Sequence, residues 1–556
     1  MNAPFNIPLI VDLIGQYLSQ DDYACCTLVN KAFRQQFKRL LWRKIRKSHS
    51  SGRGSSIPLT ADHQKALLDN GYLVRNLELE ETRHGRILRF LASSNSICKS
   101  LLIFDCKVLE HFICYNLFEQ VMDVIERSTV LKRCTIKGVM GNNTMKSNTT
   151  RFFNILANHP SLTALNLLDY AGMHHTTYRS LLQHLPKTLQ TLAIQWCIRI
   201  KNTSEPDDSA ESDWPSDYPY LRSISLSLVL RGYEESTIIP FLQRCSNLEE
   251  LEVIVDRDSV ARKLPTILWD AQQFPILTRL RLGGMRIEES EWKATVAGMQ
   301  GRIRSFSTSS VEINQALNYP DTLFATQWAD TLEVIRLQGT NVSSHEIQQI
   351  LTSCSNLKTF SVSTAFRKPA LPLSCSSGVD VKWNIDKADW VCVDLENLEM
   401  PFLDFRQIFE PDYIMSYPQI ESTILLQETH NADGIRKVYQ QLGRLTKLQY
   451  LRIGWRSSTK SNLDMSIGSG MDQMVDLKEL RVLDVGCIPH DNIREPEIKW
   501  ITRHWPRLHT IRGLLVKEFA GPSPYNKAED FEKVKDEIVP HYIQWLQKQK
   551  PNILVT

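Results

Sequence analysis

Three residues have the types and the spacing of a small metal site. Cys106, His111 and Cys114 lie in one short stretch, and thiolate and imidazole groups are the usual protein ligands of zinc. The chain has 12 cysteines, but no two of them form a Cys-x-x-Cys pair, which disfavours zinc fingers and thioredoxin-like redox motifs. Several cysteines alternate with leucines, as small buried apolar residues do. We therefore expect reduced, structural cysteines, no metal and no cofactor.

The sequence lacks the motifs of the common enzyme classes. It has no Gly-x-x-x-x-Gly-Lys-Ser/Thr loop, no Gly-x-Ser-x-Gly elbow, no His-Glu-x-x-His helix and no Gly-x-Gly-x-x-Gly turn. His174 and His175 have no carboxylate or cysteine set beside them. The pattern predicts a protein that is not an enzyme and that works by binding.

The charge and the hydropathy of the chain exclude further classes of protein. The 556 residues carry 65 basic and 62 acidic side chains, and this net charge of +3 disfavours a protein that binds nucleic acid through a broad basic field. A hydrophobic share of 42% excludes disorder throughout. No run approaches the roughly 18 apolar residues of a membrane span. The first residues lack a basic start and include Asp12, unlike a signal peptide. We expect a cytoplasmic or nuclear protein without nucleic-acid or membrane partners.

A repeated apolar pattern runs through most of the chain. The spacing apolar-x-x-apolar-x-apolar begins at Leu162, Leu189, Leu221, Leu248, Leu277, Ile303, Leu332, Leu357, Leu395, Leu448, Leu480 and Leu508, with weaker copies at Val74, Cys98, Leu131 and Ile420. From Val74 to Leu508 fifteen steps cover 434 residues, a mean of about 29, which is the length of a leucine-rich repeat. Two apolar residues two apart share one face of a strand, and the remainder returns the chain to the next parallel strand.

The repeats predict the fold class and the domains. We expect an α/β leucine-rich-repeat solenoid, with a curved parallel sheet and helices on its convex side, over residues 73–516 in about 15–16 irregular units. Helices are expected at 236–244, 345–353 and 436–444. Apolar residues at helical spacing predict a C-terminal helical cap over 517–556. Polar insertions at 201–217, 366–380 and 457–473 are either tolerated loops or extensions of a partner site.

Side chains that flank the strand leucines should lie on the concave face. Arginine and exposed aromatic residues are enriched at interface hot spots. The candidates for substrate contact are Arg279, Arg281, Arg336, Tyr450 and Arg452. The preceding unit carries Glu250 and Glu252 at the same two positions, so the first two arginines can instead be neutralised across the ladder. Arg336 and Arg452 have no such acid in the preceding unit and are the better candidates.

The first 48 residues form a different module. After Pro8, an apolar stripe that includes Ile10 and Ile14 predicts one helix. Ser19 and Asp22 resemble a capping box that begins a second helix. A third helix carries a basic cluster that is either an anion-binding patch or a solvated face, made of Lys38, Arg39, Arg43, Lys44, Arg46 and Lys47. Three such helices bury too little to be stable alone, so the module needs a neighbour or a partner. Residues 49–72 are expected to be a linker and first cap.

These residues resemble an F-box. The motif elements occur in the family's order and spacing as Ile7-Pro8, Leu13-Ile14, Tyr17-Leu18, Asp21-Asp22-Tyr23, Val29-Asn30-Lys31-Ala32-Phe33 and Leu41-Trp42-Arg43. The sequence departs from the family at Ile7 and Tyr23, where leucine is common, and at Phe33, where tryptophan is common. With the repeats behind this module, the whole chain resembles the F-box/leucine-rich-repeat proteins.

The resemblance implies a substrate-recognition adaptor of an SCF-type (Skp-cullin-F-box) ubiquitin ligase. The module would bind a Skp-type adaptor, and through it a cullin-RING ligase, while the repeats bind a target protein for ubiquitin-dependent degradation. The positions matched to adaptor contact are Pro8, Leu9, Leu13, Tyr17, Leu18, Val29 and Phe33. The sequence does not separate those that face an adaptor from those that fill the module's core. The alternative is an interaction scaffold, independent of ubiquitin, whose first helices only cap the solenoid. The substrate is not identified.

Overall fold

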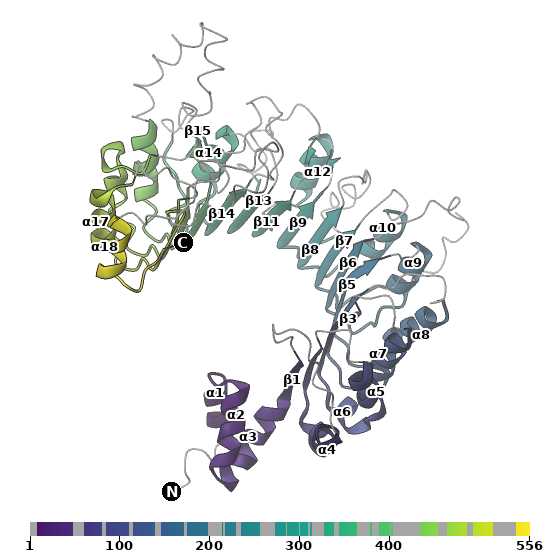
Figure 1. Cartoon of the computed structure of the whole chain (residues 1–556). Coiled ribbons are helices and arrows are strands. Elements are labelled where there is room, and N and C mark those ends of the chain that lie inside the picture. Colours follow the sequence, from purple (N-terminus) through teal and green to yellow (C-terminus); the bar gives the residue numbers. More distant parts are fainter. Residues whose placement is uncertain are drawn as a thin grey trace, which may run out of the picture. The chain divides into compact units, whose positions relative to one another are not determined.

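The structure is a computed structural model of the 556-residue chain (Figure 1). It describes residues 8–47, 61–79, 85–109, 115–138, 146–171, 175–197, 214, 217–228, 235–255, 273–284, 286–287, 289–299, 301–309, 312–313, 327–338, 344–363, 379–380, 388–400, 402–403, 434–453, 464–485, 493–514 and 541–555. The chain forms two compact units. The first comprises Met1–Ile267 and Gln272–Leu277, and the second comprises Leu268–Ala271 and Thr278–Thr556. Each unit is described by itself.

The first unit begins with three helices and continues as a parallel sheet. The helices are α1 (Pro8–Gly15), α2 (Gln20–Val29) and α3 (Lys31–Arg43). The strands, each paired in parallel with the next, are β1 (Lys44–Lys47), β2 (Asn76–Leu79), β3 (Ile103–Leu109), β4 (Arg133–Gly138), β5 (Ala164–Ala171), β6 (Thr191–Cys197), β7 (Ser223–Leu228) and β8 (Glu250–Val255).

Helices connect successive strands of this unit. They are α4 (Ala61–Asn70), the 3₁₀ turn η2 (Gly71–Leu73), α5 (Gly85–Ser93), α6 (Asn95–Ser100), α7 (Tyr115–Arg127), α8 (Lys146–Ala157), α9 (His175–Gln183) and α10 (Glu235–Gln243). Figure 1 shows α7, α8, α9 and α10 on one side of the strands. We call the opposite side the open face of the sheet.

The second unit has the same organisation. Its strands pair in parallel in the order β9 (Arg279–Gly283), β11 (Ser305–Ser309), β13 (Val334–Gln338), β14 (Thr359–Ser363), β16 (Asn397–Glu399), β18 (Tyr450–Arg452), β19 (Val482–Asp484), β20 (Thr510–Arg512) and β21 (Leu554–Val555). The helical segments are α12 (Glu289–Gly298), α14 (Ser344–Ser353), residues 434–443, η7 (Ile467–Ser469), η8 (Met471–Met474), α17 (Glu495–His504) and α18 (His541–Gln549). Two short parallel ladders join β10 (Arg286–Ile287) to β12 (Glu312–Ile313) and β15 (Val379–Asp380) to β17 (Phe402–Leu403).

The repeated apolar residues form the core. In the unit that begins at Leu162, the side chains of Leu162, Leu165 and Leu167 are fully buried, and the other strong copies bury the same positions apart from Gly513, which is half-buried. Strand side chains alternate between buried and accessible, as in β8 and β13. The predicted α/β leucine-rich-repeat solenoid is confirmed, as are the three predicted helices, which lie at α10, α14 and residues 434–443.

A polar ladder holds neighbouring repeats together where the chain turns into each strand. The Nδ2 of Asn247 donates to the carbonyl oxygen of Pro219 (2.8 Å), and the Nδ2 of Asn356 donates to that of Asp330 (2.7 Å). Each asparagine follows a buried cysteine, Cys245 or Cys354, by two residues. The sequence Cys-Ser-Asn-Leu, which occurs twice, therefore combines a small core residue with a side chain that satisfies a carbonyl of the preceding repeat.

Two weak repeat copies were placed wrongly. The copy at Cys98 is three residues out of register, because Cys98 lies in α6 and the strand that pairs with β2 buries Phe104, which is registered with Leu77. The copy at Ile420 lies outside the described residues. The described strands on either side of it, β16 and β18, pair directly with each other.

The ends of the repeat array differ from the prediction. The third helix ends at Arg43, and Lys44–Lys47 form β1, which pairs with β2. The sheet therefore begins inside the predicted helical module. At the C-terminus, α18 buries Ile543 and Leu546, and β21 then adds a further parallel strand beside β20. The described part of the predicted cap is thus a helix followed by a strand, like an ordinary repeat.

The described cysteines are free thiols. Cys98, Cys106, Cys134 and Cys245 are buried, whereas His111 and Cys114 lie outside the described residues. In the part of the chain that the structure describes, no three His, Cys, Asp or Glu side chains form a group suited to a metal ion. Within the same residues, we find no helix with the length and apolar character needed to cross a membrane.

Candidate protein-binding surfaces

The N-terminal module has a small core of its own. Val11, Phe37 and Leu40 are buried together, and Leu18, Tyr23, Cys26 and Phe33 pack partly against them. The rings of Phe33 and Phe37 stack with centroids 5.5 Å apart. The predicted capping box is confirmed: the backbone amide of Asp22 donates to the Oγ of Ser19, and the amide of Ser19 donates to the Asp22 carboxylate (2.8 Å). The Oγ of Ser19 also donates to the Asp22 carboxylate (2.7 Å), and this hydrogen bond, followed by that from the Ser19 amide, lowers the pKa of the Asp22 carboxyl group.

The same module leaves large apolar side chains in solvent. The exposed fractions are 51% for Leu13, 89% for Tyr17, 76% for Leu28 and 63% for Val29, and helix α2 buries none of its residues. Leu13 and Tyr17 are four residues apart, and Leu28 and Val29 are adjacent at the end of α2. Helix α2 contributes only partly buried side chains such as Tyr23 and Cys26 to the core, so this module is under-packed.

Exposure divides the predicted adaptor-contact residues into two groups. Leu13, Tyr17 and Val29 are open to a partner, whereas Leu18 and Phe33 are half-buried in the module's core. The side chains of Pro8 and Leu9, at the start of α1, lie outside the described ones. The predicted adaptor-contact residues do not include the exposed Leu28, because the matching F-box motif element begins at the next residue, Val29.

The module joins the sheet without a linker. Helix α3 runs directly into β1, and the backbone amide of Arg75, just before β2, donates to the carbonyl of Arg43 (2.9 Å). The side chain of Gln20 on α2 donates to the carbonyl of Lys44 (3.1 Å), so a module side chain also binds the first strand. The module is therefore attached through backbone pairing.

Two residues of the basic cluster on α3 and β1 form ion pairs, one inside the module and one with the second strand of the sheet. Arg39 forms an ion pair with Asp12 (3.0 Å), and Lys44 forms one with Glu78 on β2 (2.8 Å). Such partly exposed pairs contribute about 0 to 1 kcal/mol each. They favour the solvated-face interpretation of the cluster over an anion-binding patch.

In the second unit, we call the face that carries the accessible strand side chains its open face. On this face, the charged side chains of the first three strands are all arginines. The side chains that alternate with the core on β9, β11 and β13 are Arg279, Arg281, Ser305, Ser307, Ser309, Val334, Arg336 and Gln338. Arg279, Arg281 and Arg336 are exposed. In register, Ser307 lies between Arg281 and Arg336, and Ser361 follows on β14. As predicted, Arg336 has no facing acid on the strand before it.

Farther along this face the charges neutralise one another. The prediction that Arg452 lacks a facing acid is wrong: its guanidinium pairs with Glu399 on β16 and lies 3.9 Å from the carboxylate of Asp484 on β19. Asp484 is only 1% exposed. Burial, reinforced by the acidic charges of Asp484 and Glu399, raises the pKa of the half-buried Tyr450 hydroxyl. Arg452 and Tyr450 thus belong to a structural network as much as to a surface.

In the first unit, the acids named as partners of Arg279 and Arg281 bind hydroxyl groups on the preceding strand. The Oγ of Ser223 donates to Glu250 (3.1 Å), and the Oγ of Ser225 donates to Glu252 (2.6 Å). These acids lie on β8 of the first unit and the two arginines on β9 of the second. Their pairing across the ladder stays a prediction.

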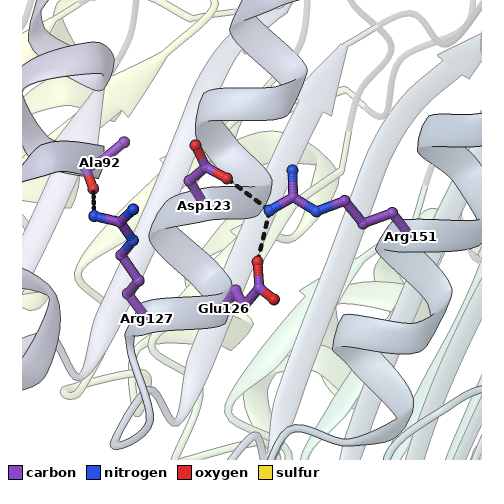
Figure 2. Close-up of polar contacts among 5 residues, drawn as sticks. All are labelled: Ala92, Asp123, Glu126, Arg127 and Arg151. Carbon is purple, nitrogen blue, oxygen red and sulfur yellow. Dashed lines mark hydrogen bonds and ion pairs between the residues drawn. The ribbon is translucent and has the colours of Figure 1, made fainter.

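The helix layer of the first unit is tied together by arginines (Figure 2). Arg151 on α8 donates to Asp123 (2.7 Å) and Glu126 (2.6 Å), both on α7, and Arg127 donates to the carbonyl of Ala92 at the end of α5. The hydrogen bond with Asp123, followed by that with Glu126, raises the pKa of Arg151. Each acid faces a cation of a neighbouring helix, so this cluster positions helices and forms no catalytic arrangement.

All three predicted insertions are partly described. In the 366–380 segment, Val379–Asp380 form β15, which pairs with β17, and the other two segments contact the repeats through side chains. Trp214, in the 201–217 segment, lies beneath the guanidinium groups of Arg179 and Arg244, whose Cζ atoms are 5.9 and 5.7 Å from the ring centroid. In the 457–473 segment, Ser466 caps η7 by accepting from the backbone amide of Ser469, and Met471 is buried. The described parts of both segments therefore pack onto the repeats.

Comparison with known proteins yields distant structural likenesses. No protein-family model matches the chain, and no curated protein matches it. Among solved structures it resembles the Rad7 and Elc1 complex in yeast (12% identity, 93% of this chain and 94% of that chain, TM-score 0.34). It also resembles an internalin from Listeria monocytogenes (11%, 78% and 89%, 0.33) and the TLR13–ssRNA13 complex (13%, 79% and 48%, 0.35). We base no argument on likenesses at these TM-scores. The leucine-rich-repeat architecture stands on the chain's own strand register and buried apolar positions.

Proposed function

We propose that the protein is a non-catalytic substrate receptor of an SCF-type ubiquitin ligase. Its N-terminal module binds a Skp-type adaptor, and the open face of its repeats holds a target protein. The observation that carries the proposal is the exposure of Leu13, Tyr17 and Val29 at positions matched to an F-box. A receptor of this kind needs no chemistry of its own, because it raises the local concentration of the target near a tethered enzyme.

The energetics support a partner on the module. Burying a large apolar side chain contributes about 1.5 to 3 kcal/mol, and four such side chains are more than half exposed on or beside α1 and α2. Helix α2 also has no fully buried side chain. A helical partner that covers these residues would supply the packing that the isolated module lacks.

Adaptor binding can be tested with variants that spare the module's core. Tyr17→Ala and Val29→Ala remove exposed side chains, and Tyr220→Ala is the matched control because Tyr220 is an exposed tyrosine on the repeats. We expect the first two variants to lose most of the Skp-type adaptor recovered by co-purification, and Tyr220→Ala to retain it. Equal recovery by all three variants and the wild type, or no recovery by the wild type, would overturn the proposal.

A second function is supported by the strand pairing between β1 and β2. This pairing makes the module a continuation of the sheet, as expected of an interaction scaffold whose first helices only cap the repeats. Deleting residues 1–43, which leaves β1 in place, separates the two functions. A scaffold cap predicts aggregation of the truncated protein, whereas an adaptor-binding module predicts folded repeats that no longer recover the adaptor.

A further inference from the structure

We propose that His159 makes one junction between repeats sensitive to acid. This junction joins the end of α7, which precedes β4, to the turn that precedes β5. The neutral imidazole closes it, and a proton on the imidazole opens it locally while the neighbouring repeats stay paired. The inference goes beyond the proposed function, because it concerns how the repeats are held together and not what they bind.

His159 occupies a position that recurs along the chain. His159, Tyr218 and Trp505 each precede a proline at the entry to a strand, and each is buried. Each donates a side-chain hydrogen bond to a backbone carbonyl of the preceding repeat, through Nε2, the hydroxyl and Nε1 respectively. The acceptors are the carbonyl oxygens of Ser128, Leu182 and Met474. The three side chains therefore close equivalent junctions with different chemistry.

Among these three donors, the imidazole is the group that titrates near neutral pH. An indole N–H does not titrate in this range, and tyrosine ionises only near pH 10. Burial raises the pKa of Tyr218 further. Mild acid therefore acts on the His159 junction and leaves the donors at Tyr218 and Trp505 unchanged.

Both ring nitrogens of His159 are used in the closed junction. The backbone amide of Ser161 donates to Nδ1 (3.3 Å), so Nδ1 carries no proton. Nε2 carries the proton that is donated to the carbonyl of Ser128 (3.0 Å). A second proton on Nδ1 would turn this acceptor into a donor that faces another donor, and would place a positive charge on a side chain that is only 5% exposed. The protonated ring therefore does not fit the closed junction.

The surroundings do not supply a carboxylate that would hold the protonated ring. The described charged and titratable side chains on the second half of α7, on α8 and in the turns before β4 and β6 are Asp123, Glu126, Arg127, Lys132, Arg151, His184 and Lys187. The two acids in this set, Asp123 and Glu126, both pair with Arg151 (Figure 2). Burial lowers the pKa of His159, against the smaller, opposite effect of the backbone carbonyls of Ser128 and Ile125.

The direction of the pH effect follows from these contacts. The ring binds a proton more readily when the junction is open than when it is closed. The stabilisation of the closed junction by the neutral ring is therefore complete above the ordinary histidine pKa of about 6.5 and is lost as the pH falls below it.

Amide hydrogen exchange of the full-length protein at about pH 7.5 and about pH 5.5, corrected for the intrinsic exchange rates, tests the proposal. One pH unit below the ordinary pKa, protonation favours the open junction by up to about tenfold. We expect peptides that cover residues 125–131 and 156–164 to exchange several-fold faster in acid, within that limit. Peptides that cover the Tyr218 and Trp505 junctions should change by less than about twofold. Equal exchange at the two pH values, or equal acceleration at all three junctions, would overturn the proposal.

Two variants assign the effect to the imidazole. His159→Tyr supplies the donor that Tyr218 uses, and His159→Gln is a smaller replacement that also does not titrate. Either variant that folds should lose the acceleration in acid. The matched control is His184→Gln, because His184 is a half-buried histidine of the next repeat whose Nδ1 donates to the carbonyl of Ser180 (2.7 Å). This control should keep the wild-type acceleration. Acceleration that persists in the folded His159 variants, or that disappears in His184→Gln, would assign the effect to another group and overturn the proposal.

Discussion

The guanidinium group of Arg452 lies 3.9 Å from the carboxylate of Asp484, which is almost completely buried. Removing the arginine would take away a cation that lies close to that buried carboxylate, and breaking a buried ion pair costs several kcal/mol. We expect Arg452→Met to lower the free energy of unfolding by about 2 to 3 kcal/mol, since Arg452 itself is partly exposed. Urea denaturation measures the change.

The control is Arg336→Met, at an exposed arginine three strands earlier in the sheet, for which we expect a change of no more than about 0.5 kcal/mol. Adding Asp484→Asn to Arg452→Met should recover part of the loss, because the buried negative charge is then gone. If Arg452→Met has the same urea midpoint of unfolding as the wild type, Arg452 does not stabilise the fold. It is then again a candidate for substrate contact.

Gly443 allows no side chain. It lies at the end of the 434–443 helix, where an added Cβ would overlap the carbonyl oxygen of Gln473. We expect Gly443→Ala to destabilise the protein by about 1 to 3 kcal/mol, although alanine favours helices, because a backbone group must shift. At Gly468 the nearest atom to an added Cβ is 3.8 Å away, so Gly468→Ala is the matched control. Thermal unfolding compares the two; equal melting temperatures would show that the helix end moves freely.

The polar ladder formed by Asn247 and Asn356 makes a smaller, local contribution to the free energy of unfolding. Asn356→Ala removes the hydrogen bond to the carbonyl of Asp330 and should lower the free energy of unfolding by about 1 kcal/mol. The adjacent Ser355 is exposed, and Ser355→Ala should change it by less than about 0.5 kcal/mol. Amide hydrogen exchange is a second readout, and faster exchange confined to the turns on either side of the ladder is expected. Unchanged exchange and stability in Asn356→Ala would show that water replaces the side chain.

Two buried thiols should make the free energy of unfolding of the protein decrease at alkaline pH. Burial raises the pKa of Cys354 and of Cys392 to about 12, so both thiols stay protonated in the folded chain after they would ionise in the unfolded one. Their contribution is complete below the unfolded pKa near 8.5 and is lost as the pH rises from there toward about 12. The Cys354→Ala, Cys392→Ala double variant should therefore show a shallower fall in unfolding free energy between about pH 8 and 10.

Alkylation followed by mass spectrometry checks the same assignment residue by residue. Cys25 is exposed on α2 and should be modified in the folded protein at neutral pH, whereas Cys354 and Cys392 should be modified only after denaturation. Modification of either buried thiol at the rate of Cys25 would contradict its place in the core.

The repeat sequence predicted the fold because each strand buries apolar residues at a fixed spacing. It did not fix the register of the weak copies: Cys98-x-x-Leu101-x-Ile103 satisfies the same pattern as Leu101-x-x-Phe104-x-Cys106, and only the pairing of β2 with β3 separates them. The pairing of Arg452 with Glu399 was not predicted from the sequence, for a related reason. The residues between β16 and β18 contain an apolar pattern at Ile420, so the sequence alone did not show that Glu399 and Arg452 lie on paired strands.

In the module, residue type did not separate core from surface. Leu13 and Leu18 belong to one apolar stripe, yet Leu13 is exposed and Leu18 packs toward Phe37. With three short helices, the crossing of α1 over α3 decides which leucine is covered, and that geometry is not encoded in the periodicity of one helix. Strand β1 was missed because its four residues, Lys44–Lys47, include three basic side chains and one isoleucine.

The direct passage from α3 into β1 has a mechanical consequence. A single peptide bond, between Arg43 and Lys44, separates the two elements, and backbone pairing with β2 fixes the strand that follows. Flexible tethers let two attached bodies search a volume that grows with tether length. Here the first strand fixes the orientation of the module instead. A protein bound to the module would therefore be held within a small volume rather than a large one.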